Sequence, residues 1–242
     1  MAAPTDRALV FDLSGPLAHY KKIFATTSAL TYPIPPKTSV YGLLAAILGL
    51  DKEGNAYLND FAEGSCRIGI QLLRPIETLR MYINLRPKFG ALGPKDNRKP
   101  TLMEFVDRPR YRLFVTHTNG ELYDRLHELL RNGQSVYTPS LGIANLIASV
   151  RFVGEGRIKA SKAEAVDSVL PKSRFRGFGT PVPGRPNRLL EAGQYAVEML
   201  PSRDVTVRDS VILDRNGTPI PAEVEGLSAI QYGEHTSHVV LF

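Results

Sequence analysis

The sequence predicts an α+β fold whose elements follow the order β-α-β-β-α-β. Three observations favour this fold: two helical patterns lie between short apolar strand patterns, a basic Pro/Gly-rich stretch interrupts two strands, and the last third is rich in strand patterns. The chain has 242 residues, of which 43% are hydrophobic and 22% are charged. This composition is ordinary for a folded protein, and the length allows one large domain or two small ones.

The first strand and the first helix enclose the most informative segment of the chain. An apolar strand is expected over 7–13 and a helix over 38–50, with an aromatic, lysine-containing loop and a proline cluster between them. Thr38 or Ser39 is expected to cap the helix, beside Lys37. Because the N-terminus of a helix attracts anions, this end of the helix predicts a phosphate site.

A basic insertion separates the next strands. Strand patterns cover 65–74 and 78–85, an irregular stretch covers 86–107, and a returning strand is expected over 110–116. An insertion of about 20 residues in a compact domain is either functional or a sign of a wrong assignment. We expect a projecting thumb that grips a nucleic-acid backbone, and a plain surface loop is the alternative. Its cations are Arg86, Lys88, Lys95, Arg98 and Lys99.

A second helix and a fourth strand complete the first domain. The helix is expected over 121–131, where the pattern is amphipathic and stops at an Asn-Gly pair, and the strand is expected over 146–153. The order β-α-β-β-α-β is that of ferredoxin-like domains. We therefore assign residues 1–154 to a ferredoxin-like domain with a thumb at about 86–107.

Residues 155–242 are predicted to form a basic loop and a β-rich C-terminal region. A short helix is expected over 162–170 and a loop over 171–188, where Phe175 and Phe178 alternate with arginines but do not follow a strand pattern. Arginines interleaved with aromatic residues suit stacking on unpaired bases, although mobile linkers share this composition. Whether this region is a separate domain stays open. Its strands are expected at 194–200, 205–213 and 237–241.

Basic charge is concentrated in two segments. The net charge is +6, yet residues 67–112 hold eleven Lys/Arg against four Asp/Glu, and residues 151–188 hold nine against three. Such grouping is typical of a polyanion-binding protein, while two solvated basic loops are the alternative. Membrane binding is disfavoured because these segments are rich in proline and glycine rather than amphipathic.

Several features exclude other classes of protein. A single cysteine excludes an internal disulfide, and five scattered histidines give no zinc-binding spacing. The N-terminus has no secretory pattern, and no apolar run reaches the roughly 18 residues that cross a bilayer. We expect a cytoplasmic protein without a metal or another cofactor.

Four stretches resemble the CRISPR-associated RAMP superfamily, whose domains are ferredoxin-like and RRM-like. The first contains the helix motif Gly42–Gly49 (GLLAAILG), and the second, Thr78–Val115, resembles a strand, a thumb and a return strand. The third is Tyr137–Gly142 (YTPSLG), and the fourth is a strand pair around a Met-Leu-Pro turn, Gln194–Leu213. In this order they resemble the type I Cascade subunit that binds the 5′ handle of the crRNA, and are most similar to type I-B members.

This resemblance implies a non-catalytic subunit that serves antiviral defence. It implies that the crRNA 5′ handle, the backbone subunit and the large subunit of the ribonucleoprotein complex are partners, and that target DNA is met only through the complex. The resemblance and the chemistry of the residues together give a set of RNA-binding candidates, in which Tyr41 either stacks on a base or belongs to the core. The set is Tyr20, Lys21, Lys22, Phe24, Lys37, Thr38, Tyr41, Gly42, Arg86, Lys88, Arg98, Lys99, Arg174 and Arg176.

Two other functions stay open at the level of sequence. Because a related subunit in type I-C systems cleaves precursor crRNA without a metal, Tyr41 and His117 are candidates for a metal-independent endoribonuclease, and His19, Tyr20 and Lys21 form a second set. A free-standing RRM-like protein that binds single-stranded RNA also fits the order of elements. However, the segment Phe175–Gly179 does not lie in the strand pattern that RRM proteins require.

Overall fold

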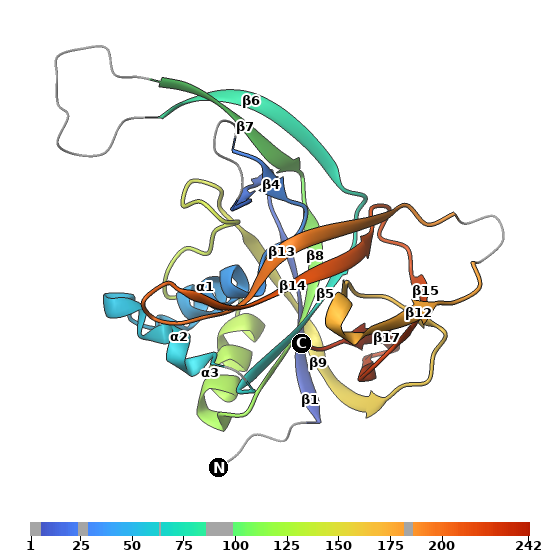
Figure 1. The fold of residues 1–242 in the computed structure, drawn as a ribbon. Coiled ribbons are helices and arrows are strands. Elements are labelled where there is room, and N and C mark those ends of the chain that lie inside the picture. Colours follow the sequence, from blue (N-terminus) through green and yellow to red (C-terminus); the bar gives the residue numbers. More distant parts are fainter. Residues whose placement is uncertain (1–5, 24–28, 63, 86–98, 182–185) are drawn as a thin grey trace, which may run out of the picture.

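A six-stranded antiparallel sheet forms the centre of the molecule (Figure 1). The structure is a computed structural model that describes residues 6–23, 29–62, 64–85, 99–181 and 186–242. The sheet has the strand order β17-β16-β9-β1-β8-β5. Its strands are β1 (Arg7–Ser14), β5 (Cys66–Leu72), β8 (Arg110–His117), β9 (Ser149–Ala160), β16 (Leu227–Tyr232) and β17 (His235–Val240).

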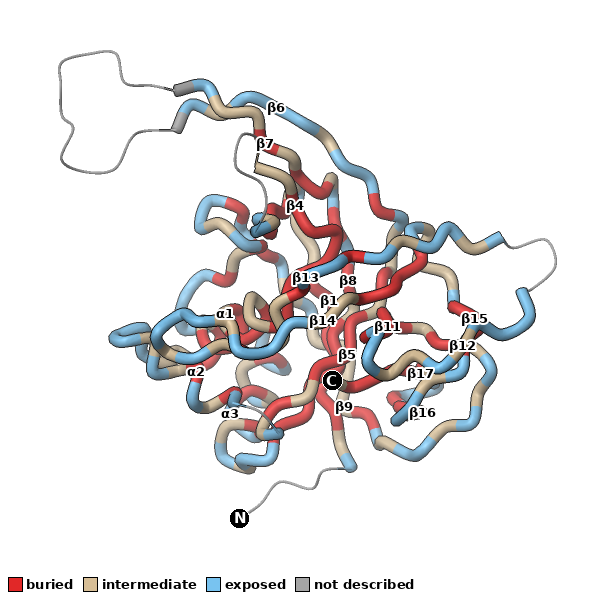
Figure 2. Tube along the Cα trace, in the orientation of Figure 1, coloured by how far each residue is buried: buried red, intermediate tan, exposed pale blue. Residues whose placement is uncertain are grey.

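Two helices cover one face of this sheet. The apolar residues Leu9, Phe11 and Leu13 of β1 are fully buried in a core shared with α1 (Lys37–Leu48) and α3 (Gly120–Arg131). Figure 2 shows this core as continuous burial along β1, β8 and β5. The elements β1, α1, β5, β8, α3 and β9 follow one another along the chain, as the sequence predicted, with further elements inserted between them.

The sheet closes on itself at its two outer strands. The backbone amide of Ile68 in β5 donates to the carbonyl of Phe242, and the amide of Phe242 donates back to Ile68, at 3.0 and 3.2 Å. The closed sheet encloses a second, smaller core on the face away from the helices, which includes Val10, Phe114 and Val239. Apolar residues therefore fill both faces of β1, which explains its nearly continuous apolar sequence.

A long hairpin projects from the sheet (Figure 1). It consists of β6 (Glu77–Leu85) and β7 (Lys99–Asp107), paired in an unbroken register from Glu77 opposite Asp107 to Leu85 opposite Lys99. The sequence predicts an irregular stretch throughout 86–107, which is wrong for 99–107. Met103 and Phe105 alternate into the core at the base of the hairpin, and this burial supports a strand that follows Pro100. Residues 86–98 lie outside the described residues.

The two long helices begin in different ways. Helix α1 begins at Lys37 with Pro36 as its N-cap and without a side-chain cap, so the expected capping by Thr38 or Ser39 is wrong. The proline segment before α1 is held by a tyrosine instead. The Tyr111 hydroxyl donates a hydrogen bond to the Pro33 carbonyl at 2.8 Å. In α3 the Asn119 side chain accepts hydrogen bonds from the amides of the first turn, as a good N-cap residue does.

In the part of the C-terminal region that the structure describes, the regular elements are strands and one short turn of helix. The predicted helix over 162–170 is wrong, because Val166 and Leu170 enter two short strands and a buried cluster. The segment Phe175–Phe178, expected in a loop, is strand β12 and pairs with β15. The boundary drawn after residue 154 falls inside β9, and β16 and β17 complete the sheet that β1 begins.

The remaining elements are short strands, two further hairpin strands and short helical turns. Among the described residues, no helix has the length and apolar character needed to cross a membrane. The remaining elements are β2 (Leu17–Ala18), β3 (Tyr20–Lys21), β4 (Thr31–Tyr32), α2 (Tyr57–Asp60), β10 (Ala165–Val166), β11 (Leu170–Pro171), β12 (Phe175–Phe178), β13 (Leu189–Met199), β14 (Val205–Asp214), β15 (Ile220–Val224), and the 3-10 turns Glu53–Asn55 and Lys172–Arg174.

Candidate nucleic-acid interface

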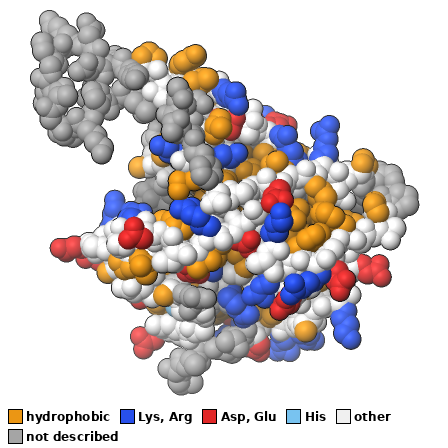
Figure 3. Space-filling model, in the orientation of Figure 1, with side chains coloured by type: hydrophobic (Ala, Val, Ile, Leu, Met, Phe, Trp, Pro, Cys, Tyr) orange, Lys and Arg blue, Asp and Glu red, His pale blue; other side chains and the backbone are white. Residues whose placement is uncertain are grey.

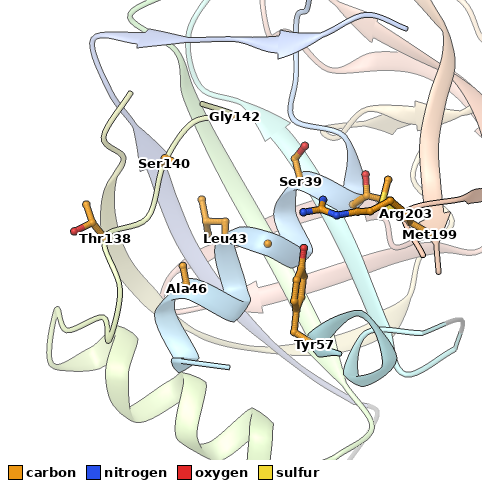
Figure 4. A pocket seen from close by; sticks show the side chains of 11 residues that line it. Ser39, Leu43, Ala46, Tyr57, Thr138, Ser140, Gly142, Met199 and Arg203 are labelled. Atoms are coloured by element: carbon orange, nitrogen blue, oxygen red, sulfur yellow. The ribbon is translucent and has the colours of Figure 1, made fainter. Parts of the chain in front are cut away.

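A groove runs along the outer side of α1 (Figure 4). The helix forms its floor, where the small residues Ser39, Gly42 and Ala46 leave room above the backbone. The segment that contains Thr138 and Ser140 forms one wall, and Tyr57, Met199 and Arg203 form the opposite side. The hollow has a volume of about 290 Å³.

A second hollow continues this groove toward the C-terminal end of α1. It has a volume of about 420 Å³ and shares Gly42, Ala46 and Tyr57 with the first hollow. Lys52 and Tyr137 line its far part. The two hollows together form one groove, here called the α1 groove, which Tyr57 and Tyr137 line. Arg203 lies near one end, and Lys52 and Asp51 lie near the other. Aromatic side chains beside cations are the usual components of a surface that binds single-stranded nucleic acid.

The wall of the α1 groove is fixed by backbone hydrogen bonds. The amides of Val136 and Tyr137 donate to the last-turn carbonyls of α1, at 3.1 and 2.9 Å. Farther along, Gly142 has a φ of 98°, and a Cβ atom there would lie 2.0 Å from the His19 carbonyl oxygen. Only glycine fits this close approach. The segment Tyr137–Gly142 therefore requires glycine at position 142, and it also lines the groove.

Arg203 is positioned by a turn between β13 and β14. Its Nε donates to the Asn55 side-chain oxygen at 3.0 Å, and the Asn55 amide nitrogen donates to the Pro201 carbonyl at 3.0 Å. The guanidinium retains other N–H groups that these bonds do not use. Figure 3 shows one face of the molecule, on which apolar, basic and acidic side chains are mixed.

Of the residues expected to bind RNA, Thr38 and Gly42 line the α1 groove, whereas Lys37 and Tyr41 are buried beneath it. The Lys37 Nζ lies 2.8 Å from Glu198 Oε1, and the Tyr41 hydroxyl donates to the same oxygen at 3.1 Å. The Tyr41 ring stacks on Phe61 with the centroids 5.2 Å apart, and burial raises the pKa of its hydroxyl. Lys37 therefore serves an internal ion pair, and neither side chain presents a surface to a nucleotide.

The loop before α1 is divided in a similar way. Tyr20 is buried, Lys21 is exposed, and the ammonium group of Lys22 lies 5.9 Å from the centre of the Tyr32 ring. Lys21 is accessible to a polyanion, while Tyr20 belongs to the core. Phe24 lies outside the described residues.

The thumb and the basic loop are described only in part. Arg86, Lys88 and Arg98 lie outside the described residues, and Lys99 belongs to β7 without a described side chain. Arg176 forms an ion pair with Glu225, so its charge is partly neutralised, while Arg174 is half-exposed in the short turn before β12.

The two residues weighed as catalytic, Tyr41 and His117, both contact Phe61 inside the core. His117 accepts a hydrogen bond from the Asn119 amide through Nδ1, so its Nε2 carries the proton and donates to the Asp60 carbonyl at 2.8 Å. Burial lowers the pKa of His117. Both ring nitrogens thus form hydrogen bonds within the protein, and these bonds connect α2, β8 and the start of α3.

Sequence reasoning missed Tyr57, Tyr137 and Arg203 as residues of the groove. Tyr137 belongs to a segment that was noted for its resemblance alone, and Arg203 follows the Met-Leu-Pro turn that was noted in the same way. Both segments were therefore visible, but neither could be placed beside α1 without the topology.

Comparison with known proteins places this fold among the proteins of CRISPR systems. A chain described as "CRISPR RNA-guided surveillance complex" aligns with a TM-score of 0.53 and 14% identity, covering 88% of this chain and 91% of that chain. A structure described as a CRISPR protein from Archaeoglobus fulgidus aligns with a TM-score of 0.56 and 13% identity, covering 96% and 99%. A search of the curated proteins gave no match.

The family follows from the sequence itself. The profile of the family described as "CRISPR-associated protein (Cas_Cas5)" matches residues 8–215. The chain belongs to the Cas5 family. It is therefore a CRISPR-associated protein.

Proposed function

We propose that this chain is the non-catalytic subunit of a type I Cascade complex that binds the 5′ handle of the crRNA. The membership of residues 8–215 in the Cas5 family is the observation that carries this proposal. The elements β1, α1, β5, β8, α3 and β9, with the strand order β9-β1-β8-β5, fit a ferredoxin-like RAMP domain. A type I-B complex is the subtype that the sequence motifs favour.

In this proposal the α1 groove receives nucleotides of the handle. Tyr57 and Tyr137 offer ring faces on which bases stack, and Arg203 and Lys52 offer charges to the phosphates. Thr38, Thr138 and Ser140 add hydroxyl groups that both donate and accept hydrogen bonds. Lys21 lies outside the groove as a further cation. This arrangement suits recognition by shape, stacking and charge rather than by a rigid set of base contacts.

The thumb has a separate role in this proposal. The β6–β7 hairpin projects from the sheet, and the sequence that joins its two strands is basic. In this proposal Arg86, Lys88, Arg98 and Lys99 contact the backbone subunit or the guide RNA. The large subunit docks nearby, and target DNA is reached only through the assembled complex. Replacement of these four cations by alanine should impair assembly with the backbone subunit. Unchanged assembly would contradict the role of the thumb.

The groove is tested by a pair of matched aromatic substitutions. Tyr137 lies in the groove and Phe178 lies outside it, and both side chains are 57% exposed. Tyr137→Ala should weaken binding of handle-containing RNA by about 1–3 kcal/mol, as expected for one stacked base. Phe178→Ala should weaken binding less, because Phe178 lies in the basic segment 171–188 and not in the α1 groove. Equal effects of the two substitutions, or equal binding of an RNA with a scrambled handle, would contradict handle recognition in the α1 groove.

The absence of catalysis is proposed as well. Tyr41 and His117 have core hydrogen bonds that a catalytic role would have to break. Repeat-containing precursor RNA should stay intact when it is incubated with the purified chain in EDTA. Cleavage that is lost in His117→Ala would contradict this and favour the metal-independent endoribonuclease.

A further inference from the structure

A group of arginines surrounds one buried carboxylate on the side of the sheet away from the helices. Asp12 of β1 lies opposite Arg112 of β8 and opposite Arg151 of β9, so the three side chains stand on one face. Arg110 precedes Arg112 by two residues on the same strand and therefore shares that face. We call Arg110, Arg112 and Arg151 the arginine cluster. Since Val10, two residues from Asp12, lies in the second core, this face is the one that α1 and α3 do not cover.

The carboxylate holds the three guanidinium groups unequally. Arg112 binds both oxygens of Asp12, at 2.7 and 3.2 Å, and its remaining Nη1 donates to the Tyr232 hydroxyl at 3.1 Å. Arg151 donates to Oδ2 at 2.6 Å, whereas Arg110 stops 3.9 Å from the same oxygen. Each of the three guanidinium nitrogens of Arg112 thus donates a hydrogen bond inside the protein. Asp12 Oδ2 accepts one hydrogen bond from Arg112 and one from Arg151, so Arg110 approaches an oxygen that already accepts two.

The charge of this group is unbalanced at the surface. The Asp12 and Arg112 side chains are 4% and 17% exposed, while those of Arg110 and Arg151 are 52% and 66% exposed. One carboxylate faces three guanidinium groups, which leaves two positive charges within reach of solvent. Two like charges held close together repel, and an external anion between them removes that repulsion.

The surrounding donors identify the kind of anion. Ser14 lies opposite Arg110 on one side and opposite Ser149 on the other, so hydroxyl groups adjoin the exposed arginines. Planar guanidinium groups bind the oxygens of a phosphate in pairs, and hydroxyl groups add single hydrogen bonds. The centre of a surface that binds another protein normally consists of aromatic or aliphatic residues. Here the centre consists of arginine, aspartate and serine.

We propose that the arginine cluster binds a phosphate of a nucleic-acid backbone, at a second site separate from the α1 groove. The nature of the partner rests on the proposed function, because a subunit of an RNA-guided complex meets both RNA and DNA. The cluster and the α1 groove lie on opposite sides of the sheet. A strand that reaches both must pass around the edge of the domain, and otherwise the two surfaces bind two different strands.

The test compares two pairs of exposed arginines. Arg110→Gln/Arg151→Gln removes the exposed charges and keeps Arg112 with Asp12. Arg125→Gln/Arg157→Gln removes the same charge from exposed positions elsewhere on α3 and β9. Binding of a short single-stranded RNA, and of a DNA of the same sequence, is measured over a range of salt concentrations. In the first variant the slope of log affinity against log salt should become shallower by about 0.7 for each phosphate that the protein no longer neutralises. The control pair should keep the slope of the unmodified chain.

The outcomes separate this proposal from the function proposed above. Weaker binding of RNA alone assigns the cluster to the guide, and weaker binding of DNA alone assigns it to a target strand; both support the site. Unchanged affinity and slope for both probes would overturn it, even where Tyr137→Ala weakens binding. If the unmodified chain binds handle-containing RNA but neither probe, this proposal fails and the proposed function stands; if it binds none of the three, both fail. Thermal unfolding verifies that each variant is folded, and Arg151→Gln alone, at the most exposed position, replaces the pair if it is not.

Discussion

Two ionic groups on the two sides of the central sheet contain similar residues but differ in balance and exposure. Near the N-terminus of α1, one ammonium faces one carboxylate, and the side chains of Lys37 and Glu198 are only 5% and 10% exposed. On the other side, Asp12 faces three arginines, of which Arg110 and Arg151 reach solvent. A balanced, sealed pair has no capacity left for a ligand, whereas the unbalanced, open group has. Charge count and exposure together therefore distinguish a structural ion pair from a binding surface.

The largest expected effect is on the sealed pair. Lys37→Met leaves Glu198 buried without its cation and should lower the free energy of unfolding by about 3–5 kcal/mol, measured by urea denaturation. Because an apolar replacement of both partners removes the buried charges, Lys37→Met/Glu198→Leu should be closer to the unmodified chain in stability. A loss below about 1 kcal/mol in the single variant would show that the pair is not sealed.

Removal of one arginine from the open group should have a smaller effect. Arg112→Met deletes hydrogen bonds to a charged group, yet Arg151 still pairs with Asp12, so we expect a loss of about 1.5–3 kcal/mol by the same measurement. A loss equal to that of Lys37→Met would mean that Arg151 does not compensate. The two groups would then be alike in energy despite their different composition.

The open group should also appear in the pH dependence of stability. Burial raises the pKa of Asp12, but hydrogen bonds and charges from Arg112 and Arg151 outweigh it and leave the pKa below the ordinary value of 3.8. The unfolded chain therefore binds the proton first as the pH falls, so this stabilisation is complete above about 3.8 and is lost below it. In Asp12→Asn, the loss of stability that Asp12 causes as the pH falls below about 3.8 should be absent. The loss from Asp214, whose pKa is also lowered by its hydrogen bonds despite burial, should remain. An unchanged slope in Asp12→Asn would contradict the assignment.

The smallest effect is expected at an exposed pair. Lys172 and Glu191 form an ion pair at 2.9 Å with both side chains about half exposed. Lys172→Met should lower the free energy of unfolding less than any of the substitutions above, because water and salt screen such pairs. A larger loss would show that exposure alone does not separate the two kinds of ionic group.

The sequence predicted the order of the main elements because each has a strong local pattern. The amphipathic repeat and the Asn132-Gly133 stop identify α3, and the apolar run of β1 identifies a buried strand. Strands β7 and β12 were not predicted, because Pro100 and Gly177 interrupt the local strand pattern. Pairing with other strands stabilises both of them. Tertiary pairing overrides local preference in such segments.

The candidate site was predicted less well for a similar reason. Lys37 and Tyr41 lie beside a helix start, which suggested a phosphate site, but their partner Glu198 is distant in sequence and could not be anticipated. The helix itself was the right element, since Thr38 and Gly42 line the groove. Arg112 was not among the candidate residues. Its relation to Asp12 and Arg151 depends on the register of three strands, which a single sequence does not reveal.

The closure of the sheet between Ile68 and Phe242 has a consequence for folding. These residues are far apart in sequence, and pairings of this kind form slowly because a long loop must close first. During synthesis, β5 is complete long before β17 leaves the ribosome, so its outer edge stays unpaired for most of that time. An unpaired strand edge is open to association with other chains. The nascent protein is therefore most exposed to misassembly in the interval before β17 is made.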